Sequence, residues 1–310
     1  MAVSAATAAV AGRAPVARAY LGLTVATACW ASAFILGKVV LREMTPLVLA
    51  TWRYVVASLV LLPFALRSRA IARPGDAPAT GAVLPLVVMV VSGGVLYPWL
   101  FLAALARTSA ANTSLLIALN PIVTILLSPI VGERLVRTQV LGASLAFAGA
   151  VLVISRGDPG ELLALRIDAG DLLALAAAAC WATFNLTSRL VVDRLPASSV
   201  NLAVYAGGAV ALGLLGLADG PVVQLEHATA SAVAAVVAMA VLSSVVAGQL
   251  FLTGVRDAGV GRAVVFIYLV PVLTAIMSVA VLGEQLSGAQ LAGGAAVLAG
   301  LLLTTRSGPR

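Results

Sequence analysis

The chain has 310 residues, of which 62% are apolar and only 10% are charged, and its mean hydropathy is +1.10. Soluble domains carry about 25% charged residues, so this composition excludes an ordinary soluble protein and indicates an integral membrane protein. The net charge of +7 resides in short segments between apolar runs, where cations orient membrane spans, so it does not indicate a nucleic-acid partner.

Ten apolar runs are long enough to cross a membrane, since a spanning helix needs about 20 mostly apolar residues. We therefore predict an all-α, polytopic membrane protein with ten transmembrane helices. The predicted ranges are 19–40, 46–66, 82–105, 109–131 and 138–155, then 171–191, 197–217, 230–254, 260–282 and 288–305. Residues 1–18 are predicted to be a tail. A signal peptide is the alternative, but the first apolar run exceeds the 7–15 residues of a signal core.

The second half of the chain repeats the first half. Cys29-Trp30-Ala31 returns as Cys180-Trp181-Ala182, 151 residues later. Further pairs at a spacing of 150 or 151 residues are Tyr54 and Tyr205, Asn120-Pro121 and Val270-Pro271, and Gly132-Glu133 and Gly283-Glu284. An ordered series of this kind indicates a duplicated chain. We predict two five-helix repeats over 19–155 and 171–305, a linker over 156–170 and a second tail over 306–310.

The odd number of helices in each repeat has a consequence for topology. Two consecutive five-helix repeats must insert with opposite orientations, and inverted repeats are typical of secondary transporters with a binding site at the midplane. Of the 19 cations, 13 lie on one predicted side, five lie on the other and Arg53 lies inside a span. The positive-inside rule then predicts that both termini are cytoplasmic and that the linker is extracytoplasmic.

These repeated motifs resemble those of a known family. The stretches from Trp30 to Lys38, from Asn120-Pro121 through Gly132-Glu133 and from Gly142 to Gly149, with their partners in the second half, are similar to EamA-type members of the drug/metabolite transporter superfamily. The resemblance implies a bacterial inner-membrane carrier that exports amino acids, metabolites or toxic compounds, and its aromatic amino-acid exporter branch is the nearest. Ala31 and Ala33 stand where the family commonly has Gly and Asn.

Trp30 and Trp181 are the leading candidates for a solute site. Each lies about ten residues into its helix, which at 1.5 Å per residue places it roughly 16 Å deep, near the midplane. Interfacial tryptophans belong at helix ends, so these two either pack between helices or line a cavity that could grip a flat aromatic solute. The other aromatic candidates are Phe34, Tyr97, Trp99 and Tyr268.

Three buried amides are the polar candidates for substrate binding, namely Asn120, Asn185 and Gln249. A buried amide must find hydrogen-bond partners, so each one either binds the solute or joins two helices. Gln249 is the repeat equivalent of Trp99, and such a pair could contact different ends of one solute.

Arg53 is the one cation well inside a predicted span, and an intramembrane charge is a functional candidate by default. It is a candidate carboxylate anchor, with Lys38 near it on the same side. The alternative is that its side chain extends to the membrane surface. Pro121 and Pro271 lie inside the predicted fourth and ninth helices, where proline kinks a helix, and we predict that they are hinges.

The sequence predicts a secondary transporter that exports small organic metabolites, with aromatic or apolar amino acids favoured, by alternating access between the repeats. The alternatives are a carrier of drug cations or nucleotide-type metabolites in the same superfamily, and a non-transporting membrane scaffold. No enzymatic activity, cofactor or metal is predicted, and the chain has no P-loop for ATP. The predicted partners are a small-molecule solute and the lipid bilayer, with the chain a monomer or a homodimer.

Overall fold

The structure, a computed structural model, describes residues 2–71, 80–105, 107, 116–158, 160, 169–282 and 287–306. These residues form helices joined by short loops, without a β-strand among them. Nine helical segments are long and apolar enough to cross a membrane, and the shorter apolar stretch Asn120–Val131 represents the fourth predicted span. The predicted all-α, ten-helix class is confirmed, and the front part of the fourth span lies outside the described residues.

The first repeat begins with a long helix, α1, which spans Ala2–Val40. Residues 2–18, predicted to be a tail, are helical and continue this helix, since alanine, the strongest helix former, is frequent there. The following elements are α2 (Pro46–Ile71), α3 (Thr80–Met89), η1 (Val90–Leu96), α4 (Tyr97–Leu105), α6 (Asn120–Leu127), η2 (Ser128–Val131) and α7 (Arg137–Ile154).

The second repeat has the same order of elements. They are α9 (Ala169–Val191), α10 (Ala197–Leu215), α12 (Ala230–Met239), η4 (Ala240–Val246), α13 (Ala247–Ala258), α14 (Val260–Ala263), η5 (Val264–Tyr268), α15 (Leu269–Leu282) and α16 (Gly288–Arg306). A short helix that was not predicted, α11 (Pro221–His227), follows the 3-10 turn η3 (Leu217–Asp219) in the loop after α10.

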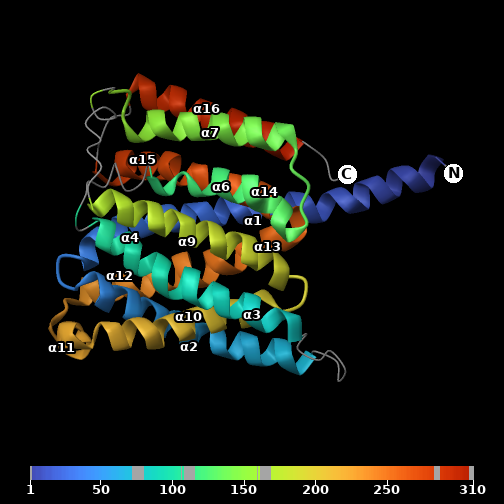
Figure 1. Cartoon of the computed structure of the whole chain (residues 1–310). Helices are drawn as coiled ribbons and strands as arrows, with labels where there is room; N and C mark the ends of the chain where they lie inside the picture. Colours follow the sequence, from blue (N-terminus) through green and yellow to red (C-terminus); the bar gives the residue numbers. More distant parts are fainter. Residues whose placement is uncertain are drawn as a thin grey trace.

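The two repeats are inverted relative to each other. The loop after α1 lies at one end of the bundle, where Thr45 bonds to Asp219 and Gln224, beside α11 (Figure 1, left). The end of the equivalent helix α9 lies at the opposite end of the bundle, where Arg189 forms an ion pair with Glu133. Equivalent helices therefore run in opposite directions, as the odd helix number predicts.

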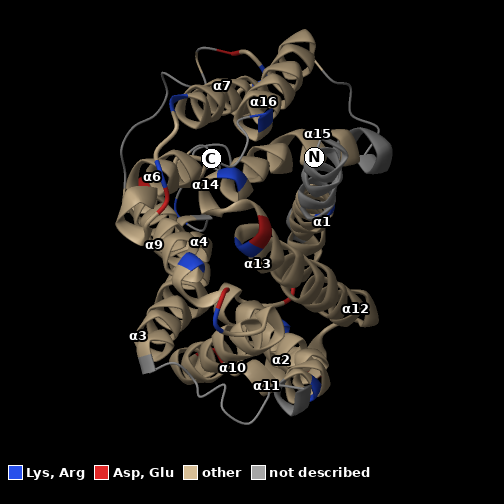
Figure 2. Ribbon diagram, turned by 90° about the vertical axis from the view of Figure 1, so that its right-hand side faces the viewer, with Lys and Arg blue, Asp and Glu red and all other residues tan. Residues whose placement is uncertain are grey.

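Packing between the repeats follows the same two-fold relation. The equivalent helices α7 and α16 lie side by side, as do α2 and α10 (Figures 1 and 2). The pair formed by α1 and α13 is matched by the pair formed by α9 and α4. Glycines permit the closest approach, because a Cβ on Gly149 would lie only 2.5 Å from the carbonyl oxygen of Gly293. Contact between backbones of this kind is typical of helix pairs in membranes.

Two features interrupt the spanning helices at equivalent positions. The third and eighth spans each contain seven residues of π-helix, Val90–Leu96 and Ala240–Val246, which start 150 residues apart. Neither π-helix was predicted, because all their residues are compatible with an α-helix.

Pro121 and Pro271 differ from the prediction in their position. Pro121 lies in the first turn of α6, directly after a two-residue turn, and Pro271 lies in the first turn of α15, after the 3-10 segment η5. Neither proline lies beyond the first turn of its α-helix, which is where a missing N–H costs least. The helical path breaks just before each proline instead.

Candidate functional site

The two repeated tryptophans meet at the interface between the repeats. The ring centroids of Trp30 on α1 and Trp181 on α9 lie 6.0 Å apart in an edge-to-face arrangement, with an interplanar angle of 81°. Because the two residues are equivalent, their contact marks the approximate two-fold axis that relates the repeats. Both rings are half-buried, so this pair lies at the centre of the bundle with part of its surface accessible.

Four further rings extend this central aromatic cluster. Trp181 stacks on Phe184 at 4.9 Å and contacts Tyr97 at 4.6 Å. Phe251 on α13 contacts both tryptophans, at 5.3 Å from Trp30 and 6.4 Å from Trp181. Tyr97 in turn stacks on Phe101 at 5.9 Å. Such a cluster offers flat apolar surfaces together with polar ring edges.

A second equivalent pair also meets between the repeats. Tyr54 on α2 and Tyr205 on α10 lie 4.9 Å apart. The guanidinium carbon of Arg53 lies 4.9 Å from the centre of the Tyr54 ring. Arg53 is therefore directed toward the aromatic interior.

The Arg53 guanidinium retains a hydrogen-bond donor without a partner. Its Nε atom is buried and has no acceptor in the part of the chain that the structure describes. A cation stacked on a tyrosine ring is stabilised electrostatically, but the unpaired N–H group is still available for an anionic or acceptor group.

The π-helix of the eighth span anchors one member of each aromatic pair. Trp30 Nε1 donates to the carbonyl oxygen of Ser243 over 3.0 Å, and the Tyr205 hydroxyl donates to the carbonyl oxygen of Ser244 over 2.8 Å. A π-turn shifts the backbone out of the regular α-helical pairing, and such turns are frequent at functional sites.

The two candidate asparagines form a helix-to-helix contact. Asn185 Nδ2 donates to Asn120 Oδ1 over 3.2 Å, and Asn120 Nδ2 donates to the carbonyl oxygen of Ile117 over 3.0 Å. Both asparagines have 0% of their surface exposed. In this conformation they join α6 to α9 next to the break before Pro121, and they do not line an accessible surface.

The remaining predicted residues lie in different places. Tyr268 is buried against Phe147, at 6.2 Å between ring centroids, and its hydroxyl has no hydrogen-bond partner among the described residues. Gln249 follows Gly248 on α13, with its Nε2 atom buried and unpaired within the described residues. Phe34 and Lys38 have their backbones in α1, while their side chains lie outside the described part of the structure.

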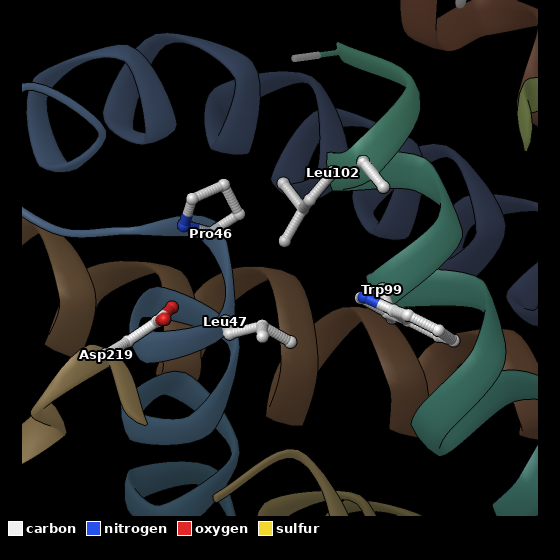
Figure 3. Close-up of a pocket in the computed structure, with 6 residues that line it drawn as sticks. Pro46, Leu47, Trp99, Leu102 and Asp219 are labelled. Atoms are coloured by element: carbon white, nitrogen blue, oxygen red, sulfur yellow. The ribbon is translucent and has the colours of Figure 1, made fainter. Parts of the chain in front are cut away.

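Trp99 lies outside the central cluster. Its side chain is 41% exposed and lines a cavity of about 170 Å³ between α2, α4 and the loop after α10. Figure 3 shows Trp99 and Leu102 opposite Pro46 and Leu47, with the Asp219 carboxylate at the edge of the cavity. The Thr45 hydroxyl donates to that carboxylate over 2.8 Å.

Charged residues join helix ends at one end of the bundle. Glu133 accepts hydrogen bonds from the backbone N–H groups of Val260 and Gly261, over 2.7 and 3.1 Å, and forms an ion pair of 3.3 Å with Arg189 Nε. Figure 2 shows this end, where acidic and basic residues lie side by side on α13. The described residues contain no group of three or more His, Cys, Asp and Glu side chains that could hold a metal ion.

The sequence did not point to Asn201, which lies against Gly248, or to Phe251, which contacts both tryptophans of the central cluster. Asn201 is 1% exposed and has an unpaired Nδ2 atom. The sequence feature that could have identified Asn201 is a single amide near the start of an apolar run. Its equivalent in the first repeat is Ala50. Phe251 was one of many apolar residues in its span.

Comparisons with known proteins agree with this architecture. A family model described as the EamA-like transporter family matches residues 17–155 and 168–306, one match in each repeat. An uncharacterized transporter of Bacillus subtilis, YyaM, is 30% identical over 87% of each chain. A probable terminal-alkyne amino-acid exporter of Streptantibioticus cattleyicolor is 28% identical over 92% of each chain. A solved crystal structure of a protein shares the fold, with a TM-score of 0.74 and 22% identity, and the match covers 93% of this chain and 98% of that one.

Proposed function

We propose that this chain, a member of the EamA-like transporter family, exports amino acids with aromatic or apolar side chains. Its family membership makes it a multi-pass membrane transporter. This choice of solute is supported by one relative whose name is that of an amino-acid exporter. The proposed location is a bacterial inner membrane with both termini in the cytoplasm, because cations concentrate on that side.

The observation that carries the proposed solute class is the unpaired Arg53 donor beside the aromatic cluster. Arg53 Nε is buried without an acceptor, and its guanidinium is stacked on Tyr54. A carboxylate is the group that a guanidinium binds best, and the rings of Trp30 and Trp181 offer a surface for an aromatic or apolar side chain. An amino acid supplies both groups in one small molecule.

The proposed mechanism is alternating access between the inverted repeats. Aromatic pairs of equivalent residues meet on the two-fold axis. A solute held there would therefore be separated from each end of the bundle by equivalent helices. Rocking of one repeat against the other would expose this site to each side in turn. The helix breaks before Pro121 and Pro271 are the proposed points of bending, because backbone pairing is already interrupted there.

A second candidate solute is an amphipathic cation, and one specific observation favours it. The cavity beside Trp99 contains the Asp219 carboxylate together with apolar side chains, as Figure 3 shows. An aromatic ring and a carboxylate are the two features that bind an ammonium group. The cavity lies at the end of the bundle that we propose to be extracytoplasmic.

Transport of radiolabelled L-phenylalanine into proteoliposomes by counterflow tests the proposal. The wild-type protein should exchange phenylalanine, and Arg53→Gln should raise the half-saturating concentration roughly 10- to 100-fold, as expected for the loss of a hydrogen bond to a charged group. The exposed Arg107, whose side chain donates to the carbonyl of Ala103, provides the matched control Arg107→Gln. Equal exchange by wild type and Arg53→Gln, or exchange of quaternary amines alone, would rule out the proposed solute class.

A further inference from the structure

The two repeats carry different residues at three equivalent positions around the tyrosine pair. Arg53 is equivalent to Val204 and Asn201 is equivalent to Ala50, both at a spacing of 151 residues, while Gln249 is equivalent to Trp99 at a spacing of 150. In each pair one member has an N–H donor on a long or amide side chain, and the other is apolar or aromatic. The two-fold symmetry of the fold is therefore broken chemically at these positions.

One polar member of these pairs, Asn201, lies against a turn of the eighth span. A Cβ built on Gly248 would lie 3.2 Å from Asn201 Nδ2 and 2.4 Å from the Tyr205 hydroxyl, so both side chains lie against the bare backbone of this glycine. Gln249 is the next residue along α13 and therefore lies on a different face of this helix. Arg53 lies beside the same tyrosine pair, because it stacks on Tyr54 and Tyr54 packs against Tyr205.

All three polar side chains present a buried nitrogen donor without an acceptor. Arg53 Nε, Asn201 Nδ2 and Gln249 Nε2 have no hydrogen-bond partner among the described residues. Buried polar groups are nearly always hydrogen-bonded, so these unpaired donors need an explanation. Since all three atoms are donors, the missing partner must be an acceptor, and a carboxylate offers about four lone-pair sites.

The equivalent turn in the first repeat has no such group of donors. The equivalent of Gly248 at a spacing of 150 is Pro98, and the equivalents of Arg53 and Asn201 are the apolar residues Val204 and Ala50, each 2% exposed. Apolar side chains of this kind suit a hydrocarbon or aromatic group, and they provide no hydrogen-bond donor for a carboxylate.

We propose that Arg53 and Asn201, which lie beside the tyrosine pair, form a carboxylate subsite next to the central cluster, so that the solute binds in a single orientation. Asn201 is the new specificity-determining residue in this subsite. The proposal rests on the proposed function, since it assumes that the solute site lies at the aromatic cluster. It adds that the carboxylate, more than the ammonium group, is the part of the solute that is recognised.

Binding of three matched compounds to the full-length protein in nanodiscs tests this subsite. L-Phenylalanine has both charged groups, 3-phenylpropionate has only the carboxylate, and phenethylamine has only the ammonium group. We expect the wild-type protein to bind the first two and to bind phenethylamine at least tenfold more weakly. Asn201→Asp, which has nearly the same shape, should weaken binding of the two carboxylates roughly 10- to 100-fold and strengthen binding of phenethylamine.

Ser199→Ala provides the matched control, because Ser199 lies on the same helix two residues away, on a different face, and also has an unpaired buried oxygen. It should bind all three compounds as the wild-type protein does. Asn201→Ser, which lacks the added charge, should show the carboxylate loss without the gain for phenethylamine, which separates loss of the amide from misfolding.

Two outcomes would overturn the inference. One of them leaves the proposed function standing, and the other contradicts it as well. If the wild-type protein binds phenylalanine but Asn201→Asp binds all three compounds unchanged, the carboxylate subsite is wrong and the proposed function stands. If the wild-type protein binds none of the three compounds, the proposed solute class is wrong and the subsite goes with it.

Discussion

At the scale of single residues, Trp30 and Trp181 are equivalent in sequence but differ in hydrogen bonding. Trp30 Nε1 is bonded to the Ser243 carbonyl in the π-helix of the eighth span. For Trp181, ring contacts with Trp30, Tyr97, Phe184 and Phe251 are its interactions within the described residues. One tryptophan therefore supports the helix geometry, whereas the N–H group of the other donates to no acceptor within the part of the chain that the structure describes.

This difference predicts unequal effects of the same substitution. Trp30→Phe should lower stability by about 1 kcal/mol more than Trp181→Phe, because it alone removes a hydrogen bond and leaves a carbonyl unpaired. Thermal unfolding of both variants in the same detergent measures the difference. Equal melting temperatures would show that the bond between Trp30 and Ser243 contributes nothing to stability.

Glu43, in the loop after α1, predicts a pH dependence at the protein surface. Its carboxylate accepts hydrogen bonds from the backbone N–H and the hydroxyl of Thr229, both over 2.7 Å, and these bonds lower the pKa of Glu43 below 4.5, with the backbone bond as the larger cause. A lowered carboxyl pKa means that stabilisation is complete above the ordinary pKa and is lost as the pH falls through the lowered value.

We therefore expect Glu43→Gln to melt at a lower temperature than the wild-type protein at pH 7, with the gap closing as the pH falls below 4.5. Melting curves of both proteins over this pH range provide the measurement. A gap that stays constant with pH would mean that the charge of Glu43 has no part in holding this loop.

At the scale of helices, the π-segments show where sequence reasoning reached its limit. Hydropathy located the third and eighth spans, because it depends on composition over about 20 residues. A π-turn depends on what the neighbouring helices require, and nothing in Val90–Leu96 or Ala240–Val246 excludes an ordinary α-helix. The difference matters for the site, because the carbonyls that hold Trp30 and Tyr205 belong to one of these turns.

Two adjacent glycines on α16 allow a matched test of helix packing. A Cβ on Gly293 would lie 2.6 Å from the carbonyl oxygen of Gly149, whereas a Cβ on Gly294 would meet only Val272, at an ordinary 3.6 Å. Gly293→Ala should therefore destabilise the protein by about 1–3 kcal/mol through overpacking. Gly294→Ala should be neutral or stabilising by up to about 1 kcal/mol, since alanine favours the helix.

Thermal unfolding of the two variants, compared with the wild-type protein, measures both effects. Similar melting temperatures for the two variants would mean that α7 and α16 can separate at little cost, so that their crossing is not a close-packed one.

At the scale of the whole molecule, the fold was predictable and much of the site was not. Ten apolar runs and a 151-residue repeat predicted inverted repeats, because an odd helix number leaves no other topology. The same equivalence placed Trp30 and Trp181 at one depth. That they touch depends on where the two-fold axis passes, which a sequence does not contain. Asn201 was missed because one amide in an apolar run is usually a packing residue.

The inverted topology predicts opposite labelling of two single cysteines. Arg42→Cys follows α1 and Asp193→Cys follows α9, and both positions are exposed. In a background that lacks Cys29 and Cys180, a membrane-impermeant maleimide should label Arg42→Cys in intact spheroplasts and Asp193→Cys only in inverted vesicles. Labelling of both positions from the same face would refute the inverted arrangement and, with it, the proposed mechanism.

Alternating access also requires that contacts at each end of the bundle can break, and Glu133 is the clearest such contact. Its carboxylate joins the end of the fourth span to the end of α9 through Arg189 and to the start of α14 through two backbone N–H groups. Gly259 fits beside it with a φ of +86°, where a Cβ would lie 3.0 Å from Glu133 Oε1. One side chain thus links both repeats at the end that we propose to be cytoplasmic.

Removing the charge of Glu133 should favour opening at this end. Ser188→Cys is a suitable reporter, because Ser188 is 0% exposed and precedes Arg189 on α9. We expect Glu133→Gln to increase its labelling rate in inverted vesicles about tenfold, since a bond to a charged group contributes roughly 1.5–3 kcal/mol. Asp193→Asn is the matched control, because it removes the other, exposed ion pair of Arg189 and leaves the link between the repeats intact. An unchanged rate in Glu133→Gln would mean that this contact does not resist the opening of the bundle.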